Sequence, residues 1–240
     1  MANFLLVHGA WQGSWVWPAV SAGLTMRGHQ VRVLDLPGNG SDATPLAEVS
    51  LSSYTRVIVD AIKAIGKPVT LVGHSMGGIA VTAAAELAST SIARIIYLCA
   101  FVPCDGDSLA SLDQLLAPPQ RAQVEMEGNG IATSTMPGSR VRTFMHDVPS
   151  AISSWASERF RPQAIAPLMT PVSITAEQYG KIARSYIICT KDQAVDPALQ
   201  RAMAKRSGCQ RVKELATSHS PFLSDPAATA EVFHRLVTEQ

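Results

Sequence analysis

Residues 73–77 read Gly-His-Ser-Met-Gly and could present a serine for attack on a substrate. They lie between an apolar run at 69–72 and a segment of small residues that begins near Gly78. In a strand-turn-helix the serine occupies a strained tight turn, and the flanking glycines lack the Cβ atoms that would clash there. We therefore expect Ser75 to stand exposed at the turn, with its hydroxyl poised as a nucleophile.

A serine hydroxyl is a weak nucleophile until a base accepts its proton, so a histidine should lie within hydrogen-bond reach. Among the six histidines, His219 follows the last predicted strand and precedes the last predicted helix, at the same sheet edge as Ser75. His8 and His74 fit better as packed, hydrogen-bonded side chains. His219 is therefore the predicted base.

The base needs a carboxylate that fixes its tautomer and stabilises its protonated form. Two candidates follow the penultimate predicted strand, Asp192 and Asp196. Asp196 directly precedes Pro197 and is typical of the N-cap of a helix over 197–205. Asp192 lies closer to the strand end, so it is the predicted third member. The chain order serine, acid, histidine is that of α/β-hydrolases.

Negative charge that develops on a carbonyl oxygen needs fixed hydrogen-bond donors, which backbone amides can supply. One donor should be the N–H of Met76, directly after the nucleophile. The loop after the first predicted strand should supply the second, and Ala10 is the predicted residue because its small side chain lets a substrate approach the backbone. Taken alone, the segment His8-Gly9-Ala10 could equally be an ordinary turn.

Composition limits the domain count and the partners. The chain has 240 residues with 47% apolar content, which suits one α/β domain and is too short for two large ones. Twenty basic and 19 acidic residues leave a net charge of +1 without a basic run, so we expect no nucleic-acid or membrane partner. The four cysteines lack the spacing of metal ligands, and we expect neither a disulfide framework nor a metal site.

The first residues resemble neither a signal peptide nor a membrane anchor, because no basic segment precedes the apolar run at 4–7. No apolar stretch approaches 18 residues, the length that predicts a membrane span. We therefore expect a cytoplasmic protein. The sequence leaves the oligomeric state open, with a homodimer as one alternative.

Short apolar β-type runs alternate with helical patterns along the chain. Because most of these runs are apolar on both faces, they predict a doubly wound, mostly parallel sheet of about six strands with helices on both faces. The final helix is expected from Pro226 to about Thr238. The predicted strands lie at 4–8, 30–34, 69–72, 93–98, 185–189 and 210–214.

The alternation of strands and helices stops near Ala100 and resumes near Ser185. A structureless loop of that length is implausible in a compact domain, so we predict an inserted cap at 103–182 on a core of 1–102 and 183–240. Trp155, Phe144, Met145 and Leu168 would give the cap an apolar underside. The predicted walls of the substrate pocket are Trp11, Phe101 and Trp155.

Together these residues resemble the α/β-hydrolase subfamily of plant methyl esterases, plant hydroxynitrile lyases and bacterial esterases of the pyrethroid-hydrolase type. The resemblance covers nearly the whole chain. It implies a triad of Ser75, Asp192 and His219, with Ala10 and Met76 as oxyanion donors. The segments that carry it are 4–11, 28–31, 35–38, 73–78, 99–103 and 218–221.

Two departures bear on the reaction. The lyases of this subfamily carry a threonine at the position of Gly9 and a lysine at that of Ser220, and the lysine stabilises the departing cyanide. Without that charge, lyase activity is disfavoured.

The sequence therefore predicts a serine hydrolase that cleaves a small, largely apolar carboxylic ester, or a carbamate, through an acyl-enzyme. It needs no cofactor, because the nucleophile and the anion donors all come from the chain. One alternative is an amidase or carbon-carbon bond hydrolase with the same triad, since fold and triad do not fix the scissile bond. Another is a ligand receptor on a hydrolase scaffold.

Overall fold

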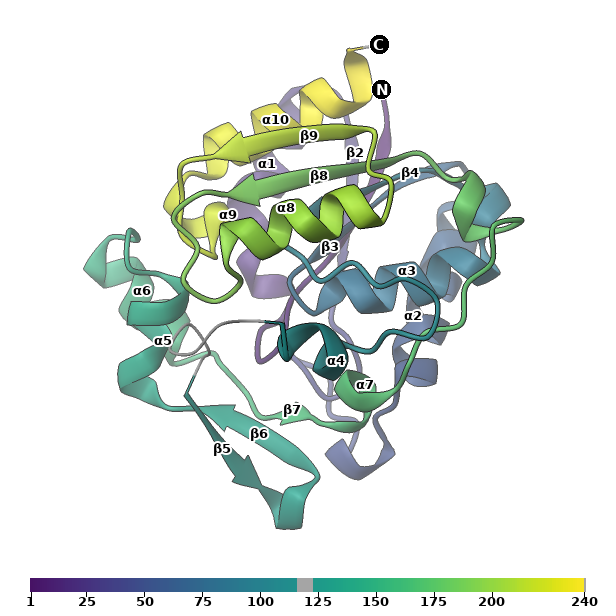
Figure 1. Ribbon diagram of the computed structural model, residues 1–240. Helices are drawn as coiled ribbons and strands as arrows, with labels where there is room; N and C mark the ends of the chain where they lie inside the picture. Colours follow the sequence, from purple (N-terminus) through teal and green to yellow (C-terminus); the bar gives the residue numbers. More distant parts are fainter. Residues whose placement is uncertain (116–122, 240) are drawn as a thin grey trace.

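A six-stranded parallel sheet forms the centre of the protein, as seen in a computed structural model that describes residues 1–115 and 123–239 (Figure 1). The strand order is β2-β1-β3-β4-β8-β9. Each strand coincides with a predicted run to within two residues, so the predicted α/β sheet is confirmed. The strands are β1 (Asn3–Val7), β2 (Gln30–Leu34), β3 (Val69–His74), β4 (Ile92–Leu98), β8 (Arg184–Cys189) and β9 (Arg211–Leu215).

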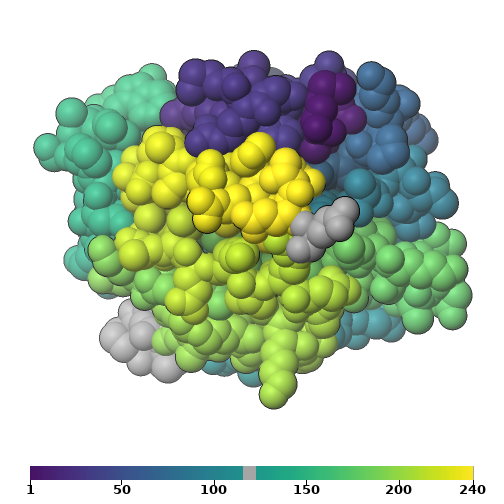
Figure 2. Space-filling model, turned by 90° about the horizontal axis from the view of Figure 1, so that it is seen from above, coloured from purple at the N-terminus to yellow at the C-terminus, as the bar shows by residue number. Residues whose placement is uncertain are grey.

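Helices cover both faces of the sheet because alternate strand residues point to opposite sides. In β1, Leu5 and Val7 belong to the core cluster that includes residues of α2, α3 and α8, whereas Phe4 and Leu6 belong to the cluster that includes residues of α1 and α10. The C-terminal helix, yellow in Figure 2, lies beside the purple N-terminal segment. The helices are α1 (Pro18–Met26), α2 (Leu51–Ile65), α3 (Gly77–Leu87), α8 (Pro197–Arg206), α9 (Pro221–Ser224) and α10 (Pro226–Thr238).

Helix α2 shows how local sequence sets the limits of an element. Ser50 and Ser53 exchange side-chain and backbone hydrogen bonds in a capping box, which satisfies N–H groups that the first helical turn leaves unpaired. Gly66 ends the helix with φ of 65°, a left-handed conformation that glycine adopts without a Cβ penalty. The apolar stripe between these caps packs on the sheet.

The elements between β4 and β8 are short helices and strands, most of which lie below the six-stranded sheet in the view of Figure 1. They include a three-stranded antiparallel sheet of β5 (Val124–Glu127), β6 (Ala132–Thr135) and β7 (Gln163–Ala164). Residues 116–122 of the predicted cap lie outside the described residues, and its boundaries at 103 and 182 stay a prediction. The helices here are α4 (Leu109–Asp113), α5 (Pro137–Phe144), α6 (Ser150–Ser157) and α7 (Ala166–Met169).

Single turns of 3-10 helix connect several elements: η1 (Ser14–Val16), η2 (Leu46–Glu48), η3 (Ser89–Ser91), η4 (Gly128–Gly130) and η5 (Tyr179–Lys181). Among the described residues, none of the helices combines the length and the apolar character that a bilayer crossing requires.

Candidate active site

Ser75 occupies the sharp turn between β3 and α3 with φ of 53°, in the left-handed region that residues other than glycine rarely adopt. The close approach of neighbouring backbone explains the glycines on either side. A Cβ on Gly73 would lie 2.9 Å from the carbonyl oxygen of Gly77, and one on Gly77 would lie 2.6 Å from that of His8. The predicted strained elbow is therefore present in the structure. The expectation that Ser75 stands exposed is wrong, because the residue is 9% exposed and lies in a cavity that Phe144 and Leu168 also line.

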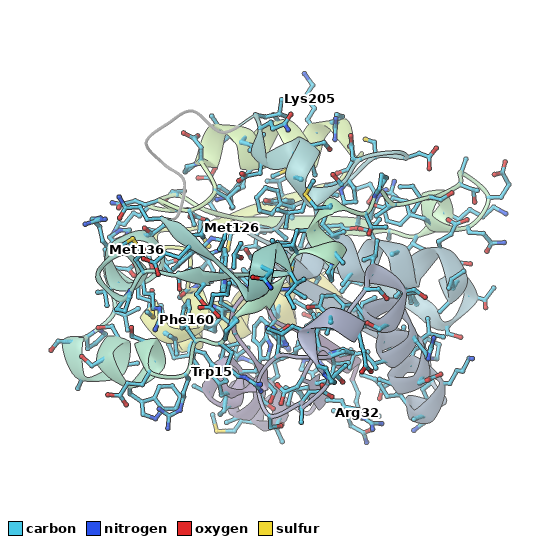
Figure 3. All side chains as sticks on the ribbon, turned by 90° about the horizontal axis from the view of Figure 1, so that it is seen from below. Trp15, Arg32, Met126, Met136, Phe160 and Lys205 are labelled. Carbon is cyan, nitrogen blue, oxygen red and sulfur yellow. The ribbon has the colours of Figure 1, made fainter. Side chains whose placement is uncertain are left out.

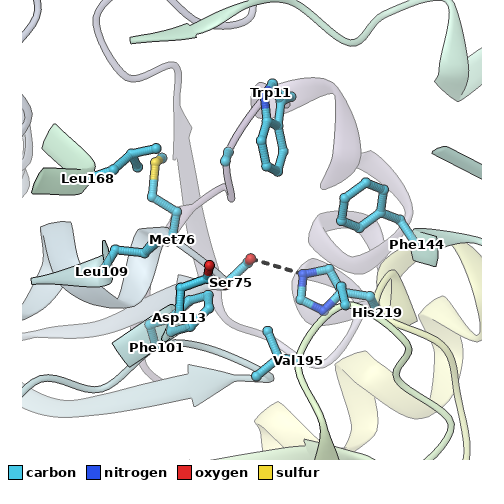
Figure 4. Close-up of a pocket in the computed structure, with 12 residues that line it drawn as sticks. Trp11, Ser75, Met76, Phe101, Leu109, Asp113, Phe144, Leu168, Val195 and His219 are labelled. Carbon is cyan, nitrogen blue, oxygen red and sulfur yellow. Dashed lines mark hydrogen bonds between the residues drawn. The ribbon is translucent and has the colours of Figure 1, made fainter. Parts of the chain in front are cut away.

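The structure brings Ser75, His219 and Asp192 together although they are far apart in sequence. His219 Nε2 lies 2.9 Å from Ser75 Oγ, and His219 Nδ1 lies 2.6 Å from Asp192 Oδ2 (Figure 4 shows the first of these contacts). Because an ionised carboxylate only accepts hydrogen bonds, Nδ1 donates to Asp192 and Nε2 is left to accept from the Ser75 hydroxyl. The imidazole is thus in the tautomer that a general base requires.

Asp192 is held by four donors, which together fix its carboxylate. Oδ1 accepts from the backbone N–H of Ala194 at 2.7 Å and of Val195 at 3.0 Å. Oδ2 accepts from Gln200 Nε2 at 2.9 Å as well as from His219. All four contacts are buried, so the carboxylate cannot turn away from the imidazole without leaving donors unpaired.

The competing carboxylate, Asp196, has a different role. Its Oδ1 accepts from Ala198 N at 2.6 Å and caps α8, which begins at Pro197. No sequence pattern indicates Gln200, which is fully buried about one turn into that helix. Only its place near the start of the helix after Asp192 could have suggested that it faces the acid.

Ala10 and Met76 both line the space in front of Ser75, as expected for oxyanion donors. Within the described parts of the chain, neither of their backbone N–H groups donates to a protein acceptor. His8 orients the peptide that carries the N–H of Ala10, because His8 Nδ1 lies 2.7 Å from the carbonyl oxygen of Gly9. In a trans peptide the N–H points in the direction opposite to the carbonyl of the same peptide. Holding the Gly9 carbonyl therefore also fixes the direction of the Ala10 N–H.

The loop that contains Ala10 is also held by hydrogen bonds to the segment between β4 and β8, which we call the inserted segment. Trp11, which follows it, has φ of 63°. Its carbonyl accepts from Arg161 N at 2.9 Å, and its indole Nε1 donates to the carbonyl of Thr133 at 3.0 Å. Strands β6 and β7 and their connections therefore help to set the position of an oxyanion donor.

A cavity with about 450 Å³ of empty space, part of it open to solvent, lies in front of Ser75 (Figure 4). Its lining is mainly apolar. Trp11 and Phe101 contribute to it, as the sequence predicted. Further lining residues that the sequence analysis did not assign to the pocket are Leu109, Asp113, Phe144, Leu168, Ala194 and Val195.

The prediction that Trp155 walls the pocket is wrong. Trp155 is 40% exposed, and its ring packs edge-on against Trp15 with centroids 5.5 Å apart. The Arg159 guanidinium covers it at 4.1 Å. Trp15 in turn contacts Phe160, which lies near it in Figure 3. Helix α6 therefore turns this indole outward, and Phe144 of α5 lies at the pocket instead.

His8 and His74 are buried and remain neutral. Burial lowers the pKa of His8, although the hydrogen bond to Gly9 opposes that effect. Burial and the neighbouring His219 hold the pKa of His74 well below its ordinary value. Their hydrogen bonds match the predicted packed roles, since His8 Nε2 accepts from Leu36 N and His74 Nε2 donates to the carbonyl of His219.

These two side chains make the stability of the protein depend on pH. Because the pKa of both histidines is lower in the folded than in the unfolded chain, the unfolded chain binds more protons as the pH falls below about 6.5, and the free energy of unfolding should fall. Each contributes up to about 1.4 kcal/mol per pH unit. Urea unfolding between pH 7.5 and 5.5 measures the slope, which His8→Asn should flatten. An equal slope in wild type and His8→Asn would contradict this account.

Among the described residues, one cluster has the ligand types of a metal site: His74, Cys99 and His219, whose donor atoms lie within 4.8 Å of one another. Both nitrogens of His219 already bond to Ser75 and Asp192. A metal at this place would have to displace the hydroxyl or the carboxylate from the imidazole. The arrangement therefore fits proton transfer better than metal binding.

Comparison with known proteins gives matches over nearly the whole chain. The model of the alpha/beta hydrolase family matches residues 4–232. The chain is 31% identical to a carbendazim hydrolyzing esterase of Nocardioides sp. (strain SG-4G), over 96% of this chain and 98% of that protein. It is 30% identical to putative methylesterase 11, chloroplastic, of Arabidopsis thaliana over 99% of its own length but spans only 63% of that relative.

Among solved structures, a pyrethroid hydrolase from Sphingobium faniae JZ-2 matches with a TM-score of 0.86 and 26% identity. The match covers 99% of this chain and 98% of that chain. Plant methylesterases and bacterial esterases are thus both among the relatives, so the resemblance seen in the sequence is confirmed.

Proposed function

The chain belongs to the alpha/beta hydrolase family, and from this premise we propose that it is a serine esterase that cleaves small, largely apolar carboxylic esters. One observation carries the proposal. A continuous hydrogen-bonded chain runs from the Ser75 hydroxyl through His219 to the buried carboxylate of Asp192, beside a mainly apolar cavity. The esterase relatives support the ester as the bond that is cleaved.

In the first half of the reaction, Ser75 Oγ attacks the ester carbonyl carbon while His219 Nε2 accepts the hydroxyl proton. The N–H groups of Ala10 and Met76 bind the oxygen that becomes negative. Asp192 stabilises the imidazolium that forms. As the tetrahedral intermediate collapses, Nε2 returns the proton to the leaving alcohol, and the acyl group stays on Ser75.

In the second half, water enters from the open side of the cavity and attacks the acyl group. His219 Nε2 accepts a proton from this water and then gives it to Ser75 Oγ as the acid leaves. The mainly apolar walls limit the number of waters near the reacting atoms, which strengthens the interaction of the amides with the oxyanion. Apart from this water and the substrate, each step uses groups that the chain itself supplies.

The position of the imidazole assigns the two sides of the pocket. The leaving oxygen must lie near Nε2, on the side of His219 where Phe144 and Val195 also lie in Figure 4. The acyl group then extends to the other side of Ser75, toward Met76, Leu109 and Leu168. We propose that the two groups of side chains select different parts of the substrate.

This assignment predicts separable changes in selectivity. Leu168→Phe should fill the acyl side and lower kcat/KM for hexanoate esters relative to acetate esters by roughly tenfold, the scale at which a pocket discriminates one or two methylenes. Its preference among alcohols should not change. Phe144→Leu should change the preference among alcohols when the acyl group is held constant, and it should leave the acyl preference unchanged. The ratios of kcat/KM over a grid of acyl and alcohol lengths measure both effects. The same change in acyl and alcohol preference in both variants would contradict the assignment.

Other hydrolytic reactions that use the same triad differ in the bond that is cleaved. Turnover of p-nitrophenyl esters compared with matched anilides and carbamates tests the proposal. We expect the ester to have the highest kcat/KM, and a faster amide or carbamate would move the assignment to that class. A receptor on this scaffold would show binding without turnover, whereas the aligned triad supports catalysis.

The local structure does not favour a lyase. A Cβ at Gly9 would lie 2.8 Å from both His74 Nδ1 and Ser75 Cβ, so this site has no room for a side chain such as threonine. Ser220 is buried, and its neutral hydroxyl cannot supply the charge that a lysine gives to a departing anion. These two positions support hydrolysis over release of cyanide.

A further inference from the structure

The loop that presents His219 is fastened to the inserted segment by one carboxylate. Asp147 lies between α5 and α6, and its Oδ2 accepts from the backbone N–H of Ser218 at 2.7 Å. Its Oδ1 accepts from Ser224 Oγ at 2.6 Å. Asp147 therefore binds the residue directly before the histidine and the short helix that follows it.

The neighbouring contacts make this attachment specific to the histidine loop. Ser218 Oγ donates to the carbonyl of Phe144 at 3.1 Å, and the backbone N–H of Ser224 donates to the carbonyl of Ser220 at 3.0 Å. The Phe144 ring also contacts the His219 ring, with centroids 5.6 Å apart. Ser218, which precedes His219, is thus bonded to the end of α5. Ser220, which follows it, is linked to Asp147 through Ser224.

Asp147 is suited to hold this loop because its carboxylate is ionised at neutral pH. Burial alone would raise its pKa, but hydrogen bonds from Ser218 and Ser224 outweigh burial and hold the pKa below its ordinary value. Hydrogen bonds to an ionised acceptor are about twice as strong as neutral ones. The Ser218 side chain and backbone are buried, so its N–H would be unpaired without this partner.

We propose that Asp147 is a positioning residue for the reaction: it holds the loop 217–220 so that His219 Nε2 stays within reach of Ser75 Oγ. The proposal rests on the proposed serine hydrolase function. It means that the inserted segment builds part of the catalytic arrangement in addition to covering the pocket. A displacement of about 1 Å in a reacting group can cost about 10²-fold in rate.

Two substitutions of Asp147 and one matched control test the proposal. Asp147→Ala removes both acceptors and should lower kcat by between about tenfold and 10²-fold, with KM within about twofold because the pocket walls remain. Asp147→Asn should restore most of kcat, since its amide oxygen can accept from Ser218 and its NH₂ can donate to Ser224 Oγ. Asp225→Ala, which removes the N-cap of α10, should lower the melting temperature without changing kcat.

A second measurement does not depend on turnover. Hydrogen exchange followed by mass spectrometry should show faster exchange of the peptide that contains Ser218 to Ser220 in Asp147→Ala, and unchanged exchange there in Asp225→Ala. If wild type fails to hydrolyse any ester, the proposed function fails while the exchange result still reports on the loop. Folded Asp147→Ala with wild-type kcat and wild-type exchange in this peptide would overturn the role of Asp147.

Discussion

Ser75→Ala is expected to lower kcat by about 10⁶-fold, the loss found when a triad serine is removed. Only the hydroxyl is lost, because alanine keeps the Cβ and the same left-handed backbone at φ of 53°. The fold and the melting temperature should therefore stay close to wild type. Steady-state hydrolysis of a p-nitrophenyl ester measures the effect.

Ser220→Ala is the matched control, since its buried hydroxyl makes no hydrogen bond within the described residues. We expect it to keep kcat within a few-fold of wild type. Retention of even a tenth of the activity in Ser75→Ala would remove this hydroxyl from the mechanism.

Asp192→Asn is expected to lower kcat by about 10⁴-fold through the wrong imidazole tautomer. The backbone N–H groups of Ala194 and Val195 require an acceptor at the Oδ1 position, so the amide oxygen of asparagine takes that place. Its NH₂ group then faces His219 Nδ1, which must become an acceptor. The proton moves to Nε2, which can no longer accept from Ser75.

Asp196→Asn provides the comparison for this prediction. Asparagine caps a helix about as well as aspartate, so the hydrogen bond to Ala198 should survive and kcat should be nearly unchanged. The two variants are compared by kcat at fixed pH together with their melting temperatures. The opposite ranking would show that Asp196 is the functional carboxylate.

The sequence predicts the parts of the site that depend on local patterns. Ser75 could be found because a strand, a glycine-flanked turn and a small-residue helix follow one another within a short segment. Asp192 and His219 could be placed because parallel strands bring their carboxyl ends to one edge of the sheet. Asp196 could be set aside because Pro197 indicates the start of a helix.

The parts that depend on how the inserted segment packs could not be predicted. Trp155 and Phe144 are both aromatic residues of short helices, and nothing in their spacing shows which of them faces the pocket. The structure turns Phe144 inward and leaves Trp155 against Trp15. Gln200 and Asp147 act through contacts with Asp192 and Ser218 that join separate elements, and the sequence analysis had no signal for either pairing.

The most direct test of the account is the site of covalent labelling by a fluorophosphonate, which traps an activated serine. Peptide mass spectrometry should locate the label on the peptide that contains Ser75, with loss of ester hydrolysis in proportion to labelling. Asp192→Asn should label far more slowly than Asp196→Asn. Labelling of another residue, or full loss of activity with Ser75 unmodified, would contradict the proposal that this serine attacks the substrate.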